Sequence, residues 1–381
     1  MTPFAITSPA RILFGRGEAA KAPALIRSFG ARGLIVHGAN PVRVQGLLAD
    51  LGVGQSGIAT LACGGEPTLP MLEDALSRAR AHRPEWVLGL GGGSVMDQAK
   101  ALAGLIPAKG GPMDHLEVVG RGLPLTEAPL PFLAMPTTAG TGSEATKNAV
   151  IGLPDHGRKV SLRDDRMLAR LAIVDPALTD GTPWPVTLAS GLDAVTQVIE
   201  PFVSCKATPY TDALTSPAIG TGLAALQRLQ QSEDKAARDA LAWVSLTGGM
   251  ALANAGLGAV HGLAGVIGGL CPAPHGAVCG ALLGPILRAN RRAAMAGSDA
   301  EKRLDRVFAL IAGCLGGSAE TAPETLAQWA KAAGLPGLGA MGFDPTWREQ
   351  TAEAALGASS TKGNPVVLTK AELLEALDRA A

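Results

Sequence analysis

The first half of the chain alternates short apolar runs with segments of helix length, and this alternation is the strongest constraint on its fold. Five runs end in turns that carry Gly, Pro or Asn, and they cover residues 11–14, 33–37, 86–90, 131–135 and 171–174. Short runs separated by helical segments are typical of a parallel sheet covered by helices on both faces. Ligands bind at the carboxyl ends of the strands in such sheets, so we expect these turns to line a binding site.

The pattern changes after Pro185. The remaining residues are rich in Ala and Leu at helical spacing, as in 236–252 and 304–315, and strand signals nearly vanish. Breaks at Pro176 and Pro183 mark a boundary between the two halves. We therefore predict an α/β domain of the nucleotide-binding type over residues 1–180 and an all-α domain over residues 181–381, which suits a chain of this length.

Composition excludes several classes of protein. Lys plus Arg and Asp plus Glu both number 33, so the chain has no net charge with which to attract nucleic acid. The five cysteines are scattered without a CxxC pair, which predicts neither a disulfide framework nor a thiolate zinc site. Residues 240–287 lack charged side chains, but glycines, prolines and two histidines in this stretch favour buried helices over a membrane span. The N-terminus has no basic and apolar leader, and we expect a cytoplasmic protein with no membrane partner.

Two loops at the predicted sheet edge have the residues of a phosphate-binding site. The segment GGGSVMD at 91–97 follows a strand and opens a helix, so its backbone can approach a phosphate and its N–H groups can bind one. The segment PTTAGTGS at 136–143 supplies hydroxyl groups after another strand. Either loop alone fits an ordinary tight turn, but the two together favour a nucleotide.

The helical half carries a set of metal-ligand residue types. Asp193 and Gln197 are four residues apart and share one face of an apolar helix, where a carboxylate needs a partner. His261 and His275 lie in the uncharged stretch. One Asp with two His is a suitable ligand set for zinc or ferrous iron, although buried histidines that merely accept or donate a hydrogen bond remain the alternative.

Taken in order, five segments resemble the successive signatures of the iron-containing (group III) alcohol dehydrogenases. They are GGGSVMDQAK at 91–100, PTTAGTGSEAT at 136–146, DPAL at 175–178, GLDAVTQVIE at 191–200, and GLGAVH at 256–261 followed by PHG at 274–276. The resemblance implies a Rossmann-like domain followed by an all-α domain, the architecture also found in dehydroquinate synthase. It also implies a metal-dependent, NAD(P)-linked oxidoreductase acting on a small alcohol or aldehyde.

The same resemblance implies the site residues. The cofactor-binding set consists of Gly38, Asn40, Gly92, Gly93, Ser94, Asp97, Thr137, Thr138, Thr141, Ser143, Lys159 and Leu178. The metal set consists of Asp193, Gln197, His261 and His275. In the implied mechanism the metal polarises the alcohol oxygen, and hydride passes to the nicotinamide.

Three positions depart from the family pattern. Gln197 stands where iron-using members have a histidine ligand, which weakens iron binding and makes zinc an alternative. Gly265 stands where many members have a further histidine, a proton-relay group. The loop at 37–40 lacks the acidic residue that would bind a ribose 2′-hydroxyl, and Asn40 and Arg43 lie there instead, which favours NADP over NAD.

Other functions stay open at this stage. A metal-free reductase like maleylacetate reductase would have no need of Asp193. A lyase like dehydroquinate synthase would need basic residues near the metal helices, and these helices carry almost none. A non-catalytic cofactor-binding module is the third alternative, suggested by Gln197 and Gly265. We expect a homodimer, with the N-terminal strand available for pairing across a two-fold axis.

Overall fold

The computed structural model describes residues 3–52 and 57–381, which form two compact units. One is an α/β unit made of residues 7–138 and 143–179. The other is helical and consists of residues 180–381, residues 139–142 and the described residues up to Ile6. The short segment 139–142, which includes Thr141, thus belongs with the helical unit although it begins only three residues after the end of a strand of the sheet.

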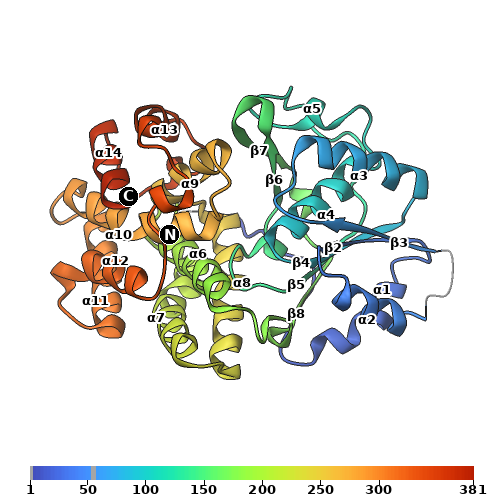
Figure 1. Ribbon diagram of the computed structural model, residues 1–381, viewed down its shortest axis with the longest axis horizontal. Helices are drawn as coiled ribbons and strands as arrows, with labels where there is room; N and C mark the ends of the chain where they lie inside the picture. The colour runs from blue at the N-terminus through green and yellow to red at the C-terminus, as the bar shows by residue number, and fades with distance from the viewer. Residues whose placement is uncertain (1–2, 53–56) are drawn as a thin grey trace. The chain divides into compact units, whose positions relative to one another are not determined.

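The α/β unit contains a six-stranded parallel sheet with the strand order β1-β8-β5-β4-β2-β3 (Figure 1). Its strands are β1 (Ile12–Phe14), β2 (Gly33–Gly38), β3 (Ile58–Cys63), β4 (Trp86–Gly91), β5 (Phe132–Pro136) and β8 (Leu171–Val174). All five predicted runs are strands, and their ends differ from the prediction by one residue at most. The predicted parallel α/β domain is confirmed.

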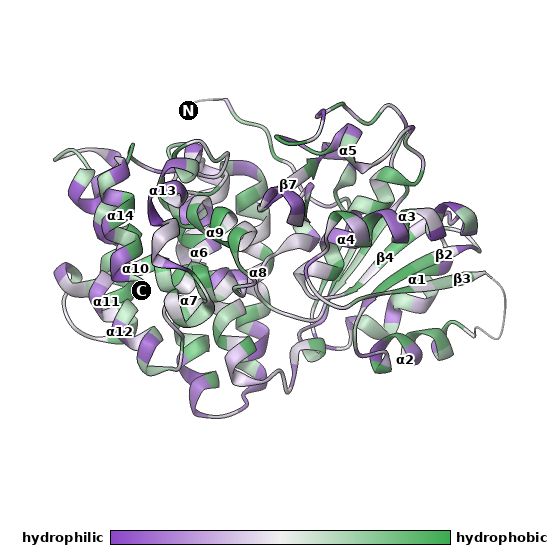
Figure 2. Cartoon of the chain, turned by 45° about the horizontal axis from the view of Figure 1, so that its top comes forward, coloured by the Kyte–Doolittle hydropathy of each residue, from purple (hydrophilic) through white to green (hydrophobic). Residues whose placement is uncertain are grey.

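Alternating side chains on the strands divide the apolar core into two layers. On β2, Leu34 and Val36 face one layer and Ile35 faces the other, and all three side chains are buried. The layer at Leu34 is covered by α3 (Leu69–His82) and α4 (Gly93–Leu105), and the layer at Ile35 by α1 (Ala22–Arg27) and α2 (Val42–Asp50). Figure 2 shows the strands in hydrophobic green between these helices. A sheet buried on both faces needs the continuous apolar runs seen in the sequence.

The prediction missed three strands and one short helix. Strand β3 is one of them, and an antiparallel hairpin of β6 (Asn148–Leu153) and β7 (Arg158–Arg163) supplies the other two. The hairpin alternates buried and partly exposed residues along β6, which is the mark of a half-buried strand. The helix α5 (Pro112–His115) completes the α/β unit.

The second unit contains only helices among the residues that the structure describes, as predicted. They are α6 (Trp184–Val203), α7 (Pro209–Gln231), α8 (Lys235–Ala255), α9 (Ala259–Leu270), α10 (His275–Ala293), α11 (Asp299–Leu315), α12 (Ala322–Ala332), α13 (Arg348–Leu356) and α14 (Lys370–Arg379). No single described helix is long and apolar enough to cross a membrane. Helices α8 and α9 together have the length and apolar composition of a membrane span, but the chain bends by 99° between them.

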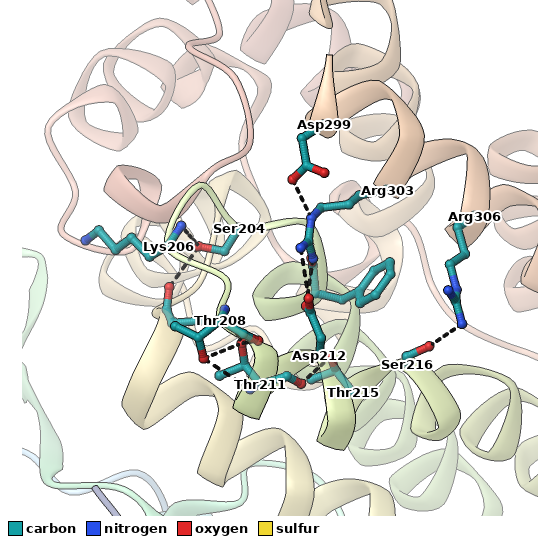
Figure 3. Close-up of polar contacts among 12 residues, drawn as sticks. Ser204, Lys206, Thr208, Thr211, Asp212, Thr215, Ser216, Asp299, Arg303 and Arg306 are labelled. Carbon is teal, nitrogen blue, oxygen red and sulfur yellow. Dashed lines mark hydrogen bonds and ion pairs between the residues drawn. The ribbon is translucent and has the colours of Figure 1, made fainter. Parts of the chain in front are cut away.

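A cluster of ion pairs holds α11 against α6 and α7 (Figure 3). The guanidinium of Arg303 donates to both carboxylate oxygens of Asp212 at 2.6 and 2.8 Å, and to Asp299 and the carbonyl oxygen of Phe202 at 2.7 Å each. Arg306, one turn nearer the middle of α11, donates only to Ser216 in that view. A guanidinium with this many acceptors joins three helices and is a structural anchor.

Candidate metal centre and coenzyme site

The loops predicted to bind a nucleotide leave one edge of the sheet. Gly91 at the end of β4 is in register with Pro136 at the end of β5, and the N–H of Thr137 donates to the Gly91 carbonyl oxygen at 2.9 Å. A Cβ placed on Gly92 would lie 3.2 Å from the Thr138 hydroxyl oxygen, so these two loops lie against each other.

The first turn of α4 offers backbone donors at this edge. Gly92 is the extended N-cap of the helix, and no described side chain caps it. The N–H groups of Gly93, Ser94 and Val95 therefore have no partner inside the helix. Uncapped N–H groups beside hydroxyl-bearing loops and glycines without a Cβ match the chemistry of a diphosphate.

Asp97 and Ser143, two of the predicted cofactor residues, are brought together by a buried lysine. The Ser143 hydroxyl donates to Asp97 Oδ1 at 2.9 Å. Lys100 Nζ donates to Ser143 O and Oγ, to Thr146 Oγ1 and to Asn148 O at 2.7–3.0 Å. Lys100 is completely buried, and it ties α4 to the loop after β5 and to the hairpin.

The charges in this network perturb one another. Burial lowers the pKa of Lys100 to about 8, although the carboxylates of Asp97 and Glu144 oppose the change. Burial also raises the pKa of Asp97, against the nearby ammonium, and raises the pKa of Glu144 to about 7. The network is therefore sensitive to pH near neutrality and above.

Of the remaining predicted cofactor residues, Thr141 belongs to the helical unit, and Gly38, Asn40, Lys159 and Leu178 lie in the α/β unit. Gly38 ends β2, and a Cβ added there would meet nothing within 4 Å. Asn40 Oδ1 accepts from the N–H of Val42 at the start of α2, and Arg43 donates to the Leu178 carbonyl oxygen at 2.7 Å. Lys159 on β7 forms an ion pair with Glu66.

A second cluster lies wholly inside the helical unit. Four side chains each offer one potential ligand atom, and these atoms all lie within 4.8 Å of one another. The residues are Asp193 on α6, His261 on α9, and His275 and Cys279 on α10. Nε2 of His261 lies 3.3 Å from Oδ1 of Asp193, and Nε2 of His275 lies 3.7 Å from Sγ of Cys279. Gly276 allows this approach, because a Cβ there would stand 2.4 Å from the Ala189 carbonyl oxygen of α6.

Glu200 orients the His261 ring from behind. Its Oε2 lies 2.6 Å from Nδ1 of His261, and its Oε1 accepts from the N–H of Val260 at 2.8 Å. The Asn364 side chain accepts from the N–H of Ala259 in the same first turn of α9. Because the carboxylate accepts the Nδ1 proton, a neutral His261 ring would keep the lone pair of Nε2 free for a cation in the cluster.

This arrangement fits a cation. Oδ1 of Asp193 is buried and accepts no hydrogen bond from any described residue. Nε2 of His261 lies 3.3 Å from this oxygen, and in a neutral ring that donates from Nδ1 to Glu200 the Nε2 lone pair would face it. Such a contact requires either a proton or a metal ion between the two groups.

The pKa directions agree with this interpretation. Burial lowers the pKa of His261, but the Cys279 sulfur, Glu200 and Asp193 outweigh it and hold the pKa well above its ordinary value. The Cys279 sulfur likewise raises the pKa of His275 to about 9. Burial raises the pKa of Cys279, but the two imidazoles more than offset this and leave it lowered. In the absence of an ion, protons on the two imidazoles thus balance the clustered anions, and a metal ion bound there would displace those protons.

Gln197, the fourth predicted ligand, is buried one turn from Asp193 on α6. Its side-chain nitrogen donates to the Gly140 carbonyl oxygen at 3.0 Å, in the segment that follows β5. Gly265, one turn after His261, leaves open space where a side chain would project.

Sequence reasoning missed three residues here. Glu200 is the last residue of a quoted motif, but its role depends on a partner 61 residues away. Cys279 carries a readable signal, because it follows His275 by four residues and so shares its helix face. Lys100 is charged and fully buried, and the sequence offers no sign of its four acceptors.

Comparisons with known proteins agree along the whole chain. The family model described as iron-containing alcohol dehydrogenase matches residues 9–176, and that of the C-terminal domain of the same family matches residues 187–381. The probable alcohol dehydrogenase EutG of Salmonella typhimurium is 33% identical over 318 residues, which are 82% of this chain and 76% of that one. EutG of Escherichia coli is 36% identical over 228 residues, which are 60% of this chain and 57% of that one. A crystal structure of a 1,3-propanediol oxidoreductase covers 100% of both chains with a TM-score of 0.87 and 27% identity.

Proposed function

The chain belongs to the iron-containing alcohol dehydrogenase family, and on this premise we propose that it interconverts a small alcohol and its carbonyl compound, using NADP and one divalent metal held by Asp193, His261 and His275. Three relatives are named methanol dehydrogenase, 1-propanol dehydrogenase and 1,3-propanediol oxidoreductase, after short alcohols, and another is named long-chain-alcohol dehydrogenase. Iron and zinc both suit one carboxylate with two imidazoles.

The single observation that carries the proposal is the buried cluster around Oδ1 of Asp193, an oxygen with no hydrogen-bond partner among the described residues that lies 3.3 Å from Nε2 of His261 and near His275 and Cys279. A metal-free reductase would gain nothing from such a contact and would pay for burying it. When bound, the metal supplies Lewis acidity toward an alcohol or carbonyl oxygen, and the nicotinamide accepts or donates the hydride.

The protein groups hold and orient these partners. Glu200 fixes the tautomer of His261, so that Nε2 keeps its lone pair for the cation. In the α/β unit, the α4 N-terminus and the hydroxyls of Thr137 and Thr138 bind the coenzyme diphosphate. Lys100 keeps Ser143 in place beside Asp97.

We expect Gly38→Asp to shift the coenzyme preference. A carboxylate at the end of β2 repels a 2′-phosphate and accepts a bond from a 2′-hydroxyl, so the ratio of kcat/KM with NADPH to that with NADH should fall about 10- to 100-fold. The site is open at Gly38, so the side chain fits. Steady-state kinetics with both coenzymes measures the ratio, and Gly38→Asn is the matched neutral control. An equal fall in the Asn variant would show that size, and not charge, causes the loss.

We expect Glu200→Gln to weaken metal binding about 10- to 100-fold, because the ring of His261 loses its charged hydrogen-bond partner. Competition with a chromogenic chelator measures the affinity. Glu324→Gln, which alters a surface pair with Arg288 in the same helical unit, should bind metal like the unchanged protein. Equal affinity in the Glu200 variant would contradict the orienting role.

The assembly and location complete the proposal. We infer a homodimer and a cytoplasmic enzyme, as the sequence predicts. Strand β1 lies at the edge of the sheet, with β8 as its only partner among the described strands, and this is the position that pairing across a two-fold axis requires.

An activity screen tests the proposal. Purified protein is loaded with Zn²⁺ or Fe²⁺ and offered short alcohols, diols and aldehydes with NAD(H) and NADP(H) in parallel. The proposal expects turnover of at least one alcohol–carbonyl pair, and expects a chelator to abolish it. Absence of turnover with every metal and coenzyme would refute the dehydrogenase, and turnover that resists chelation would refute the metal.

A further inference from the structure

A thiol occupies the position that a fourth ligand needs. Cys279 follows His275 by one turn of α10, so its side chain lies on the same helix face. Its Sγ is completely buried and lies 3.7 Å from Nε2 of His275. Among the cysteines in the described chain, Cys279 alone belongs to the cluster with Asp193 and His261.

Distances inside the cluster match those between ligands of one tetrahedral zinc ion. Bonds of about 2.0–2.1 Å to nitrogen or oxygen and about 2.3 Å to sulfur put tetrahedral ligands about 3.3 Å apart for an N–O pair and about 3.6 Å for an N–S pair. The His261–Asp193 pair is 3.3 Å apart and the His275–Cys279 pair is 3.7 Å apart. The other pairs lie within 4.8 Å, so closing them requires only small side-chain movements.

Gln197 is a poorer candidate for the same position. Its amide is neutral, and its nitrogen is already bonded to the Gly140 carbonyl oxygen at 3.0 Å. A thiolate brings the negative charge and the softness that zinc prefers, whereas an amide brings neither. With Asp193, the thiolate also balances both charges of a divalent ion in a buried site.

We propose that the Cys279 thiolate is the fourth protein ligand of the metal, in place of Gln197, and that the site is a zinc site of one Asp, two His and one Cys. This inference rests on the proposed function for the metal at Asp193, His261 and His275. Catalytic zinc accepts a fifth ligand, so a substrate oxygen still has a place.

Cobalt(II) substitution tests the ligand directly, because a thiolate bound to Co²⁺ gives an intense near-ultraviolet charge-transfer band and imidazole or carboxylate ligands do not. Metal-free protein titrated with Co²⁺ should develop the band at one equivalent. Cys279→Ser and Cys279→Asn should bind Co²⁺ without the band, and should lose more than about 100-fold in Zn²⁺ affinity, since a lost ligand costs more than a lost outer partner.

Two variants serve as controls. Cys205→Ser removes an exposed thiol outside the cluster, and Gln197→Ala removes the competing amide; both should keep the band.

The outcomes separate the two claims. Stoichiometric Co²⁺ binding without the band in the unchanged protein overturns the Cys279 ligand and leaves the proposed metal-dependent function standing. Loss of the band in Gln197→Ala with retention in both Cys279 variants also overturns it. Failure of the unchanged protein to bind any metal would instead refute the metal centre. The spectrum of the unchanged protein tests the Cys279 ligand even if a Cys279 variant does not fold.

Discussion

Asp193→Asn should abolish stoichiometric metal binding and lower kcat/KM for the best alcohol at least about 10³-fold. The substitution preserves the size of the side chain but replaces the buried, unpartnered carboxylate oxygen with a neutral amide. Loss of Lewis acidity is worth several kcal/mol of transition-state stabilisation, and about 4 kcal/mol corresponds to that factor. Metal content by elemental analysis and steady-state kinetics measure the two effects.

The prediction also specifies what should not change. Apart from Thr141, the groups expected to bind the coenzyme belong to the α/β unit, whereas Asp193 belongs to the helical unit. The dissociation constant for NADPH, followed by its fluorescence, should therefore stay within about threefold, or roughly 0.7 kcal/mol. Asp305→Asn, which alters an exposed pair with Arg291, is the matched control for both readouts. A fully metallated and active Asp193 variant would place the metal elsewhere.

Much of the fold is readable from the sequence, for a physical reason. A strand buried on both faces needs an unbroken apolar run, and the five such runs stand out against their Gly- and Pro-rich turns. Strand β3 is half-exposed and rich in small residues, β6 alternates buried and partly exposed residues, and β7 alternates polar and apolar residues. Those three strands are stabilised by pairing with neighbouring strands, and the local sequence does not reveal this pairing.

The candidate site divides along a similar line. Residues whose proposed role depends on their local position alone, such as Gly92 at the start of a helix, can be predicted from the motif. Residues that act through a distant partner do not. Glu200 matters because the fold brings α9 beside it, and the ligand role proposed for Cys279 needs α6 and α9 around α10. The absence of a CxxC pair pointed away from a thiolate, because that pattern detects only cysteines paired with each other.

Lys100→Met should destabilise the α/β unit by about 3–5 kcal/mol, the usual cost of removing one partner from a buried charged network. The ammonium donates to four oxygens, and methionine fills the space without replacing any of these bonds. Asp97 and Glu144 also lose their nearest cation. Because the chain has two units, hydrogen exchange of peptides from β4, β5 and β6 is the readout, since it reports the opening of this unit alone.

Lys147→Met is the matched control for this variant. Its ammonium pairs on the surface with Asp165, an interaction worth about 0–1 kcal/mol, so the exchange of the same peptides should barely change. Equal protection in the Lys100 and Lys147 variants would contradict a structural role for the buried ammonium.

The same network predicts a dependence on pH with a definite sign. Burial lowers the pKa of Lys100 from its ordinary 10.5 to about 8, so between these values the unfolded chain binds a proton that the folded protein has released. The free energy of unfolding therefore rises with pH across this window in the unchanged protein. Lys100→Met lacks the titrating group, and its deficit relative to the unchanged protein should widen as pH rises from about 8 to about 10.5. Burial acts on Glu144 in the opposite sense, because its pKa is raised to about 7 and its contribution to stability falls as pH rises from 4.5 to 7. A deficit that is constant from pH 8 to pH 10.5 would mean that Lys100 keeps its ordinary pKa, and that its four acceptors stabilise the ammonium enough to offset its burial.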